Sequence, residues 1–182
     1  MNKLNIEYEN DLIKLVLIKP EHSIMYTEKV NNSSAETIYF TGSEDMRVTE
    51  EQTLKYINNM QENNKRYDYL IFDKKSNNFI GEVVLNEIDY ENRKANMRIL
   101  IFNKKDYNKG FGNQAIKFIL KHGFEALKLH RIELDVYDFN ERAKYLYEKI
   151  GFKIEGVSRE CKFYNGKFCS SINMSILENE YF

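Results

Sequence analysis

Residues 106–115 read Asp-Tyr-Asn-Lys-Gly-Phe-Gly-Asn-Gln-Ala and stand between an apolar segment and a long helical pattern. Two of the chain's eight glycines, Gly110 and Gly112, are one residue apart here. A glycine loop that enters a helix exposes unpaired N–H groups at the positive end of the helix dipole, which favours an anion. A plain connector that needs positive φ would look the same. The loop lacks the third glycine of the dinucleotide fingerprint and the Gly-Lys-Ser/Thr of the P-loop. The glycines alone leave both interpretations open.

The segments around this loop predict a mixed α/β sheet. Alternating or continuous apolar runs predict strands over 12–18, 67–72, 79–88, 95–102 and 132–136, followed by a hairpin over 152–177. Helical spacing predicts helices over 21–30, 49–60, 113–127 and 143–150, the last ended by Gly151. The strand, the glycine loop, the helix and the next strand form a βαβ unit, so those two strands are parallel. The other strands form an antiparallel meander, and Asn165-Gly166 is a strong hairpin signal.

Two local predictions can be checked residue by residue. Thr49 and Gln52 match a capping box, with Leu54, Ile57 and Met60 expected on one buried face of the helix that follows. The stretch YFTGSED before that helix, residues 39–45, is predicted to be a loop.

Composition excludes several classes of protein. The chain has 182 residues, 42% hydrophobic and 30% charged, which fits one globular domain over residues 1–182. The net charge of −1 gives no reason to expect a nucleic-acid partner. We find no apolar run of about 18 residues, so we expect no membrane span. The first residues carry acids and no small-residue cleavage site, so we expect no signal peptide and a cytoplasmic location.

A second motif lies one helix and one strand after the loop. Residues 140–152 read NERAKYLYEKIGF, which resembles the N-x-x-A-x-x-x-Y-x-x-x-G-F signature of the GNAT N-acetyltransferases. The loop itself, read from Tyr107 to Gly112, resembles the family's R/Q-x-x-G-x-G/A signature. Each motif alone is weak, but both occur in order and at the usual spacing. The segment GFKIEGVSRECKFYNGKF is similar to the branch of spermidine and ribosomal-protein N-terminal acetyltransferases.

The resemblance implies a site for acetyl-CoA as co-substrate. The loop would hold the pyrophosphate through main-chain N–H groups, and the preceding strand would pair with the pantetheine arm and offer an N–H to the thioester carbonyl. The implied coenzyme-binding residues are Ile99, Leu100, Ile101, Phe102, Tyr107, Asn108, Lys109, Gly110, Phe111, Gly112, Asn113, Asn140 and Tyr147. Tyr107 departs from the usual Arg or Gln, and we expect little loss because the donors are main-chain groups. Lys109 either adds a charge contact to phosphate or is a solvated lysine.

Two side chains of the second motif have implied catalytic roles. Tyr147 would donate a proton to the departing thiolate as general acid, and the alternative is a core tyrosine. Asn140 would contact the pantetheine arm or the catalytic region, which is compatible with its being a helix N-cap.

The general base is less well defined. Some polyamine-acetylating relatives have Glu at the start of the strand before the loop, but this chain has Asn96 there, which cannot be a base. Glu82, Glu87 and Asp89 are the remaining carboxylates, and Glu82 is the candidate; a water chain is an equal alternative. For Asp89 we favour a solvated or paired acid.

The remaining reactive side chains suggest no other chemistry. His22, His122 and His130 are scattered, and no metal set is visible. Cys161 and Cys169 are interpreted as packing residues, with a reactive free thiol as the lesser alternative. Without a base near Cys161, direct transfer in a ternary complex is favoured over an acetyl-cysteine.

The acceptor stays open at this point. A polyamine, a protein N-terminus and an amino sugar or aminoglycoside are the alternatives, and a non-catalytic acyl-CoA-binding or sensing module is a further one. A polyamine site should be lined with acids, and the segment before residue 61 is rich in them: Glu28, Glu36, Glu44, Asp45, Glu50 and Glu51. Proteins of the branch that this chain resembles often form homo-oligomers, and the sequence does not determine whether this chain does.

Overall fold

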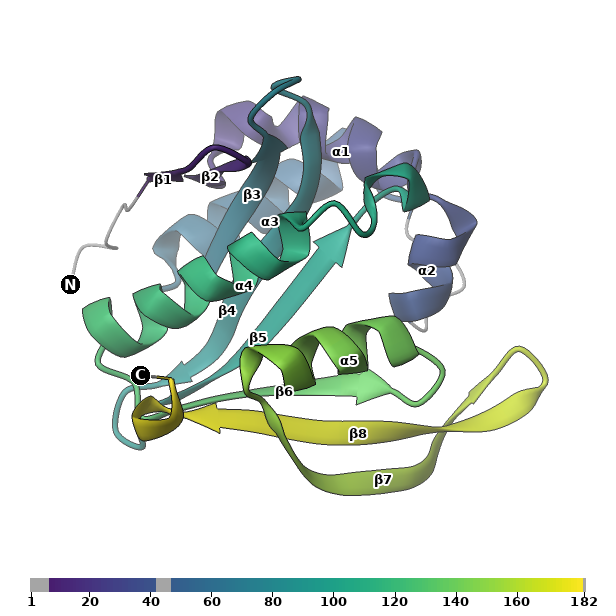
Figure 1. Ribbon diagram of the computed structural model, residues 1–182. Helices are drawn as coiled ribbons and strands as arrows, with labels where there is room; N and C mark the ends of the chain where they lie inside the picture. The colour runs from purple at the N-terminus through teal and green to yellow at the C-terminus, as the bar shows by residue number, and fades with distance from the viewer. Residues whose placement is uncertain (1–6, 42–46, 182) are drawn as a thin grey trace.

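A computed structural model describes residues 7–41 and 47–181, and its centre is an eight-stranded sheet (Figure 1). The strand order is β1-β2-β3-β4-β5-β6-β8-β7. The strands are β1 (Tyr8–Glu9), β2 (Ile13–Leu17), β3 (Tyr67–Asp73), β4 (Phe79–Asp89), β5 (Lys94–Ile101), β6 (Arg131–Tyr137), β7 (Lys153–Tyr164) and β8 (Lys167–Leu177). Every pair is antiparallel except β5 with β6, as the βαβ unit predicted. The predicted fold class is confirmed.

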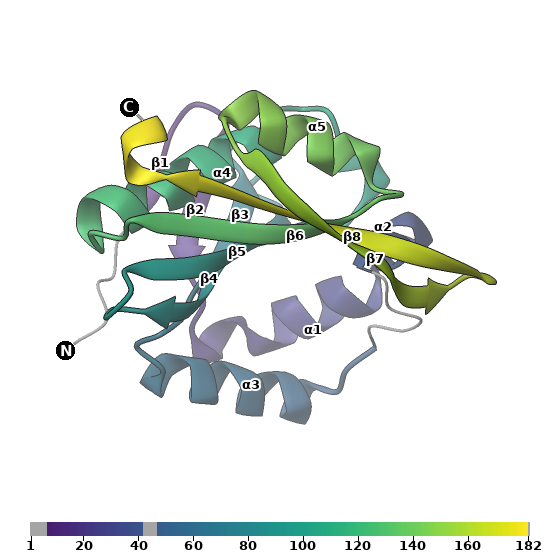
Figure 2. The same ribbon diagram turned by 90° about the horizontal axis from the view of Figure 1, so that it is seen from below.

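Helices cover both faces of the sheet (Figure 2). They are α1 (Ser23–Asn31), α2 (Ala35–Thr41), α3 (Glu50–Glu62), α4 (Phe111–Lys121) and α5 (Glu141–Ile150). The helices α1 and α3 lie on one face, and α4 and α5 lie on the other. Short helical turns occur at η1 (Pro20–His22), η2 (Lys104–Asp106), η3 (His122–Ala126, a π turn) and η4 (Glu178–Glu180). None of the helices in the described part of the chain is long and apolar enough to cross a membrane.

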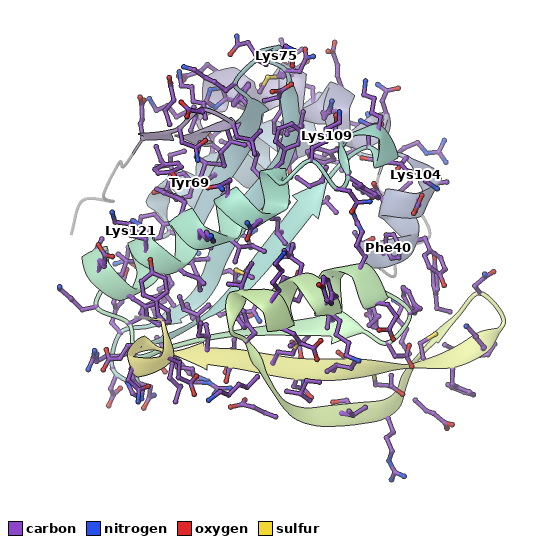
Figure 3. The ribbon with its side chains drawn as sticks, viewed as in Figure 1. Phe40, Tyr69, Lys75, Lys104, Lys109 and Lys121 are labelled. Carbon is purple, nitrogen blue, oxygen red and sulfur yellow. The ribbon has the colours of Figure 1, made fainter. Side chains whose placement is uncertain are left out.

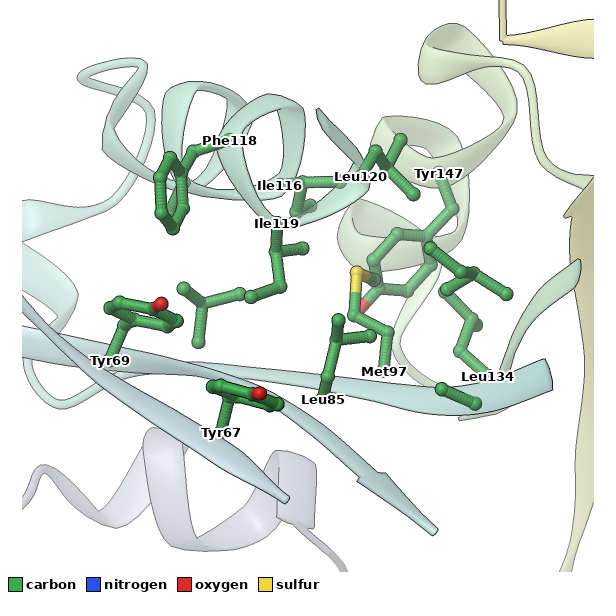
Figure 4. Close-up of a cluster of buried hydrophobic side chains, with 14 of the residues drawn as sticks. Tyr67, Tyr69, Leu85, Met97, Ile116, Phe118, Ile119, Leu120, Leu134 and Tyr147 are labelled. Atoms are coloured by element: carbon green, nitrogen blue, oxygen red, sulfur yellow. The ribbon is translucent and has the colours of Figure 1, made fainter. Parts of the chain in front are cut away.

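Each face of the sheet has its own hydrophobic core, because strand side chains alternate between faces. The larger core joins the sheet to α4 and α5 and includes Tyr67, Tyr69 and Ile71 of β3 (Figure 4). The smaller core contains Leu70 of the same strand, with Ile57 of α3. The strand β3 is therefore buried on both sides, which explains its nearly continuous apolar sequence.

The local predictions are mostly confirmed. Thr49 caps α3: its hydroxyl accepts a hydrogen bond from the Gln52 N–H at 3.2 Å, and Oε1 of Gln52 accepts one from the Thr49 N–H at 2.8 Å. Both residues of the hairpin turn, Asn165 and Gly166, have positive φ (50° and 78°), as a type I′ turn requires. Gly151 ends α5 with a φ of 118°.

Three predictions about local structure are wrong. Tyr39 to Thr41 form the last turn of α2, a helix that the sequence analysis missed; the remainder of the predicted loop, residues 42–45, lies outside the described residues. Leu54 of α3 is exposed, and Thr53 is buried in its place because it bonds Thr27 on α1 at 2.7 Å. Cys161 is exposed on β7, so it is not a packing residue, whereas Cys169 is buried as expected.

Candidate active site

The strands β5 and β6 diverge along their length (Figure 1), and residues of both line a cleft. The two strands are paired only from Lys94–Asn96 to Arg131–Glu133, and beyond that point the ladder stops. The cleft has a volume of about 910 Å³. It is lined by the rest of β5, the end of β6, one side of α5, the glycine loop, and residues of β4, α1, α2 and α3. The break in the sheet therefore provides a long opening with main-chain groups along one wall.

The wall formed by β5 offers free backbone groups. The Phe102 N–H donates to the Ile80 carbonyl of β4 at 3.0 Å. Since successive residues of an antiparallel strand point to opposite sides, Ile99 directs both its N–H and its C=O group to the open side, and Ile101 directs its N–H group there. The Ile101 carbonyl accepts from the Thr37 hydroxyl at 3.1 Å. Of the predicted strand residues, Ile99, Leu100 and Ile101 line the cleft.

Phe102 does not belong to this wall. Its side chain is fully buried in the smaller core. Its N–H is bonded to Ile80, and its carbonyl accepts from the Ser34 N–H at 3.0 Å and from the Thr37 hydroxyl at 2.9 Å. The structure thus places this predicted coenzyme-binding residue behind the cleft.

The glycine loop presents main-chain donors to the cleft. Asn108 (φ 60°) and Gly110 (φ 86°) both adopt left-handed conformations, and Gly110 is the N-cap of α4. Within the described parts of the chain, no group accepts a hydrogen bond from the N–H groups of residues 108–113. Six predicted residues of the loop line the cleft: Tyr107, Asn108, Gly110, Phe111, Gly112 and Asn113. Unpaired N–H groups at a helix start favour a bound anion.

Lys109, labelled in Figure 3, is not among the residues that line the cleft. Its Nζ is 3.1 Å from Oδ1 of Asp106, and it also lies 5.9 Å from the centre of the Phe111 ring. This lysine is engaged with a protein carboxylate, so the structure gives no support to its predicted phosphate contact.

Tyr147 and Asn140 of α5 both line the cleft. Tyr147 is buried next to Met97 and Leu134 (Figure 4), and its hydroxyl makes no hydrogen bond to any described residue. Burial raises the pKa of Tyr147 to about 12, and the positive charge of Arg142 opposes that rise. The hydroxyl is therefore protonated at neutral pH and available as a donor. Asn140 is the N-cap of α5, and its Oδ1 accepts from the Ala143 N–H at 3.2 Å.

Glu82 is the buried carboxylate of the opposite wall. It is 4% exposed on β4 and lines the cleft. It accepts a hydrogen bond from the Tyr26 hydroxyl at 2.7 Å, and Oε1 lies 3.6 Å from the guanidinium of Arg98. Burial raises the pKa of Glu82, while the charge of Arg98 opposes that rise. A carboxylate with a raised pKa is a better proton acceptor than an ordinary glutamate.

The other base candidates lie elsewhere. Glu87 is exposed, and Asp89 caps its own turn by accepting from the N–H groups of Glu91 and Asn92 at 3.0 Å. Asn96 sits in the closed part of the sheet, opposite Asn86 and Glu133, and does not line the cleft. Among the three carboxylates considered from the sequence, only Glu82 reaches the cleft.

Sequence reasoning missed the side chains around Glu82. Tyr26 of α1 and Tyr56 of α3 line the same wall. Tyr56 donates to Oδ1 of the buried Asp68 at 2.9 Å, and Arg66 pairs with the same carboxylate at 2.8 Å. Periodicity alone identifies such tyrosines only as half-buried helix residues, since their partners are distant in sequence.

The early acids do not provide the expected acidic lining. Glu28, Glu50 and Glu51 are exposed outside the cleft, and Glu36 pairs with Lys104 at 2.9 Å. Glu44 and Asp45 lie outside the described residues. The carboxylates that do line the cleft in the described residues are Glu82, Asp106 and Asp135.

The histidines occupy separate places, as expected. His22 accepts from the Lys19 N–H through Nδ1 at 2.9 Å, and His130 pairs with Glu178 at 3.1 Å. His122 is buried among Tyr67, Tyr69 and Phe118. Neither of its ring nitrogens has a hydrogen-bond partner in the described part of the chain, and burial lowers its pKa to about 4.

Comparison with known proteins identifies the family. The model of the acetyltransferase (GNAT) domain matches residues 13–153, which include both motifs and all the cleft-lining strands. This chain belongs to the GNAT acetyltransferase family. The predicted resemblance is therefore confirmed, and acetyl-CoA is the co-substrate that the family uses.

Several relatives share the branch that the C-terminal segment suggested. The chain is 32% identical to spermidine N(1)-acetyltransferase of Escherichia coli K12 over 123 residues, covering 63% of this chain and 66% of that protein. It is 39% identical to the Vibrio cholerae enzyme of the same name over 104 residues, covering 57% and 60%. It is 31% identical to the putative ribosomal N-acetyltransferase YdaF of Bacillus subtilis over 101 residues, covering 56% and 55%. The matched regions span between about half and just under two thirds of these relatives.

A solved structure extends the likeness to the whole fold. Spermidine N-acetyltransferase from Vibrio cholerae, in complex with CoA and spermine, superposes with a TM-score of 0.83 and is 28% identical. The superposition covers 94% of this chain and 99% of that one. The cleft of our structure fits such a coenzyme, because the loop N–H groups suit phosphate and the open edge of β5 suits an amide-containing arm.

Proposed function

We propose that this protein transfers an acetyl group from acetyl-CoA to a primary amine of a polyamine, by direct attack in a ternary complex. The observation that carries the proposal is a single cleft with two chemically different walls. One wall has the free N–H groups of residues 108–113 and the buried hydroxyl of Tyr147, and the other has the buried carboxylate of Glu82. The names of the relatives support a polyamine as the acceptor.

The residues divide the reaction between them. The loop N–H groups hold the pyrophosphate, and the open edge of β5 holds the arm and donates an N–H to the thioester oxygen as negative charge develops there. Asn140 supports the start of α5, which places Tyr147 beside the break in the sheet. The neutral amine nitrogen forms a bond to the acetyl carbon as the carbon–sulfur bond breaks, and Tyr147 gives its proton to the sulfur. The proton that the nitrogen loses as it becomes an amide returns to Tyr147 through water, so the tyrosine is restored.

The amine must first lose a proton, because it is an ammonium ion at neutral pH. Glu82 is the proton acceptor in this proposal, directly or through water. Tyr26, which donates its hydroxyl to that carboxylate, and Tyr56 line the same wall, and aromatic rings suit an ammonium group. The thiols take no part, since Cys161 and Cys169 are both on the hairpin and neither lines the cleft.

The test is a product screen with the full chain. We would incubate acetyl-CoA with spermidine, spermine, N-terminal peptides of ribosomal proteins and aminoglycosides, and identify acetylated products by mass spectrometry. We expect acetylated polyamines to dominate. Dominant acetylation of the peptides or aminoglycosides would reassign the acceptor, and coenzyme binding without turnover of any amine would favour a sensing module. A homo-oligomer and a cytoplasmic location stay predictions from the sequence.

A further inference from the structure

Arg142 places a positive charge beside Tyr107, the first residue of the glycine loop. It belongs to the first turn of α5 and lines the cleft. Its guanidinium carbon lies 3.5 Å from the centre of the Tyr107 ring and 5.5 Å from that of Phe40. Across the described residues it makes no ion pair or hydrogen bond. Its N–H donors therefore remain available while its position is set by stacking.

The ring beneath Arg142 is itself fixed. The Tyr107 hydroxyl lies 2.7 Å from Oγ1 of Thr37, a fully buried residue of α2. The same Oγ1 lies 3.1 Å and 2.9 Å from the carbonyls of Ile101 and Phe102 at the end of β5. Because Thr37 donates its hydroxyl hydrogen to these carbonyls, Tyr107 is the donor in its own bond to Thr37. Tyr107 is thus a rigid platform tied to the strand that leads into the loop.

The other cations near the cleft are differently placed. Lys109 is paired with Asp106, and Arg98 faces Glu82 on the opposite wall. Lys149 also lines the cleft, but it lies two turns further along α5, roughly 10 Å from Arg142 along the helix axis. Among the described cations, Arg142 is the one that combines contact with the first residue of the loop and freedom from an acid partner.

We propose that Arg142 binds the pyrophosphate of the coenzyme, together with the loop N–H groups, and that Tyr107 holds it in place. This inference rests on the proposed function. Tyr107, the first residue of the loop, carries no charge, and the guanidinium stacked on it comes from α5. A guanidinium suits this role because it can bond two phosphate oxygens at once. Tyr107 is then a positioning residue, and Arg142 is a coenzyme-binding residue.

Binding measurements separate this role from catalysis. We would measure the dissociation constants of CoA, dephospho-CoA and pantetheine by calorimetry at one salt concentration. The wild type would be compared with Arg142→Gln and with Lys144→Gln, which removes the same charge from the same helix outside the cleft. We expect Arg142→Gln to weaken CoA and dephospho-CoA equally, by roughly tenfold or more, and to leave pantetheine unchanged. Lys144→Gln should change the CoA constant by no more than about twofold.

Each contrary result has a separate meaning. Loss of affinity for CoA alone would assign Arg142 to the 3′-phosphate and overturn the pyrophosphate site. Equal affinity of wild type and Arg142→Gln for CoA would overturn any phosphate role. A wild type that binds no CoA would overturn the proposed function itself.

The role of Tyr107 is tested by a double-mutant cycle. Tyr107→Leu removes the ring, and we expect it to weaken CoA about as much as Arg142→Gln does. The double variant should bind no more weakly than Arg142→Gln alone, because the platform acts only through the arginine. Tyr107→Phe keeps the ring and should retain most of the affinity. Additive losses in the double variant would show that Tyr107 does not act through Arg142.

Discussion

The two walls of the cleft are made of different parts of the polypeptide. The wall that we assign to the coenzyme (the coenzyme wall) offers mostly main-chain groups, from the loop and from the open edge of β5, and we assign the wall around Glu82 (the acceptor wall) to the amine. The acceptor wall offers buried side chains, with Glu82 bonded to Tyr26 and Asp68 bonded to Tyr56 and Arg66. Main-chain recognition depends on backbone shape and tolerates many sequences, whereas side-chain recognition changes with each substitution. The coenzyme should therefore be shared across the family and the acceptor should vary.

The largest effect is expected where the coenzyme wall uses a side chain. Tyr147→Phe removes the proton donor and leaves the ring in its buried site. We expect kcat to fall by roughly 10²–10⁴-fold with little change in coenzyme affinity. Steady-state kinetics with spermidine, and calorimetry with CoA, would measure both.

The control is Tyr90→Phe, a surface tyrosine at the turn after β4. Its kinetics should match the wild type. An unchanged kcat in Tyr147→Phe would remove the general-acid assignment and leave the coenzyme wall with a role in binding alone.

The next effect concerns the scaffold behind the coenzyme wall. His122 follows α4, and burial lowers its pKa from 6.5 to about 4. The unfolded chain then binds a proton at His122 more readily than the folded chain does. The contribution of neutral His122 to the free energy of unfolding is therefore fully present above pH 6.5 and is lost as the pH falls toward 4. The loss is roughly 3 kcal/mol at the acid end. His122→Leu should flatten this part of the curve of unfolding free energy against pH, measured by urea denaturation.

The matched comparison is His130→Leu, an exposed histidine paired with Glu178. That variant should keep the loss of stability that the wild type shows between pH 6.5 and 4. An identical slope between pH 6.5 and 4 in His122→Leu and the wild type would show that other groups cause it.

On the acceptor wall, Glu82 should make stability depend on pH in the direction opposite to His122. Burial raises the pKa of Glu82, so its ionisation lowers the stability of the fold as the pH rises through that pKa. The ionised carboxylate is also the form that can act as the proposed base, so base activity should appear over the same pH interval. Glu82→Gln should lower kcat/KM by roughly 10²-fold and remove the part of the acidic limb that Glu82 causes. Rate profiles against pH with spermidine would test this.

Glu87→Gln is the control on the same strand, because Glu87 is exposed outside the cleft. It should retain the wild-type profile. If Glu82→Gln retains it too, the base is water, and the acceptor wall serves only to bind the amine.

The smallest effects should come from the two glycines of the loop. Gly112 has no positive φ, and an added Cβ would meet Ile99 and Leu146 at 3.6 Å, an ordinary contact. Gly112→Ala should stabilise the fold by about 0.5 kcal/mol through helix propensity and keep the CoA affinity. Gly110 has a φ of 86°, so Gly110→Ala should destabilise by about 1 kcal/mol. Thermal denaturation compares the two, and equal effects would contradict the distinction.

Much of the coenzyme wall could be predicted from the sequence. The strand, the loop and the helix that form it are consecutive, and their turn and helix signals are local. The positions of Tyr147 and Asn140 followed because both belong to one helical motif. Phe102 and Lys109 were included by continuity, and the structure buries Phe102 behind the cleft and pairs Lys109 with Asp106.

The acceptor wall could not be predicted in the same way. Its residues come from α1, α3 and β4, and they meet only because the helices pack on one face of the sheet (Figure 2). Tyr26 and Glu82 are 56 positions apart, and no local pattern relates them. The sequence did not identify Arg142 either, because its contact with Tyr107 joins residues that are distant in sequence.

The short pairing of β5 with β6 also affects how the molecule unfolds. Only three residue pairs join the strands β1–β5 to the strands β6–β8 within the sheet. One hydrophobic core contains side chains of both sets, so we expect the β5–β6 ladder to open before the rest of the sheet, and amide exchange would measure the free energy of that opening. A coenzyme that contacts β5, the loop and α5 together binds only when both sets are in place. Binding at 100 times its dissociation constant would add about 2.7 kcal/mol to the cost of separating them. Under the proposed function, the bound co-substrate therefore also stabilises the sheet at the point where β5 and β6 separate.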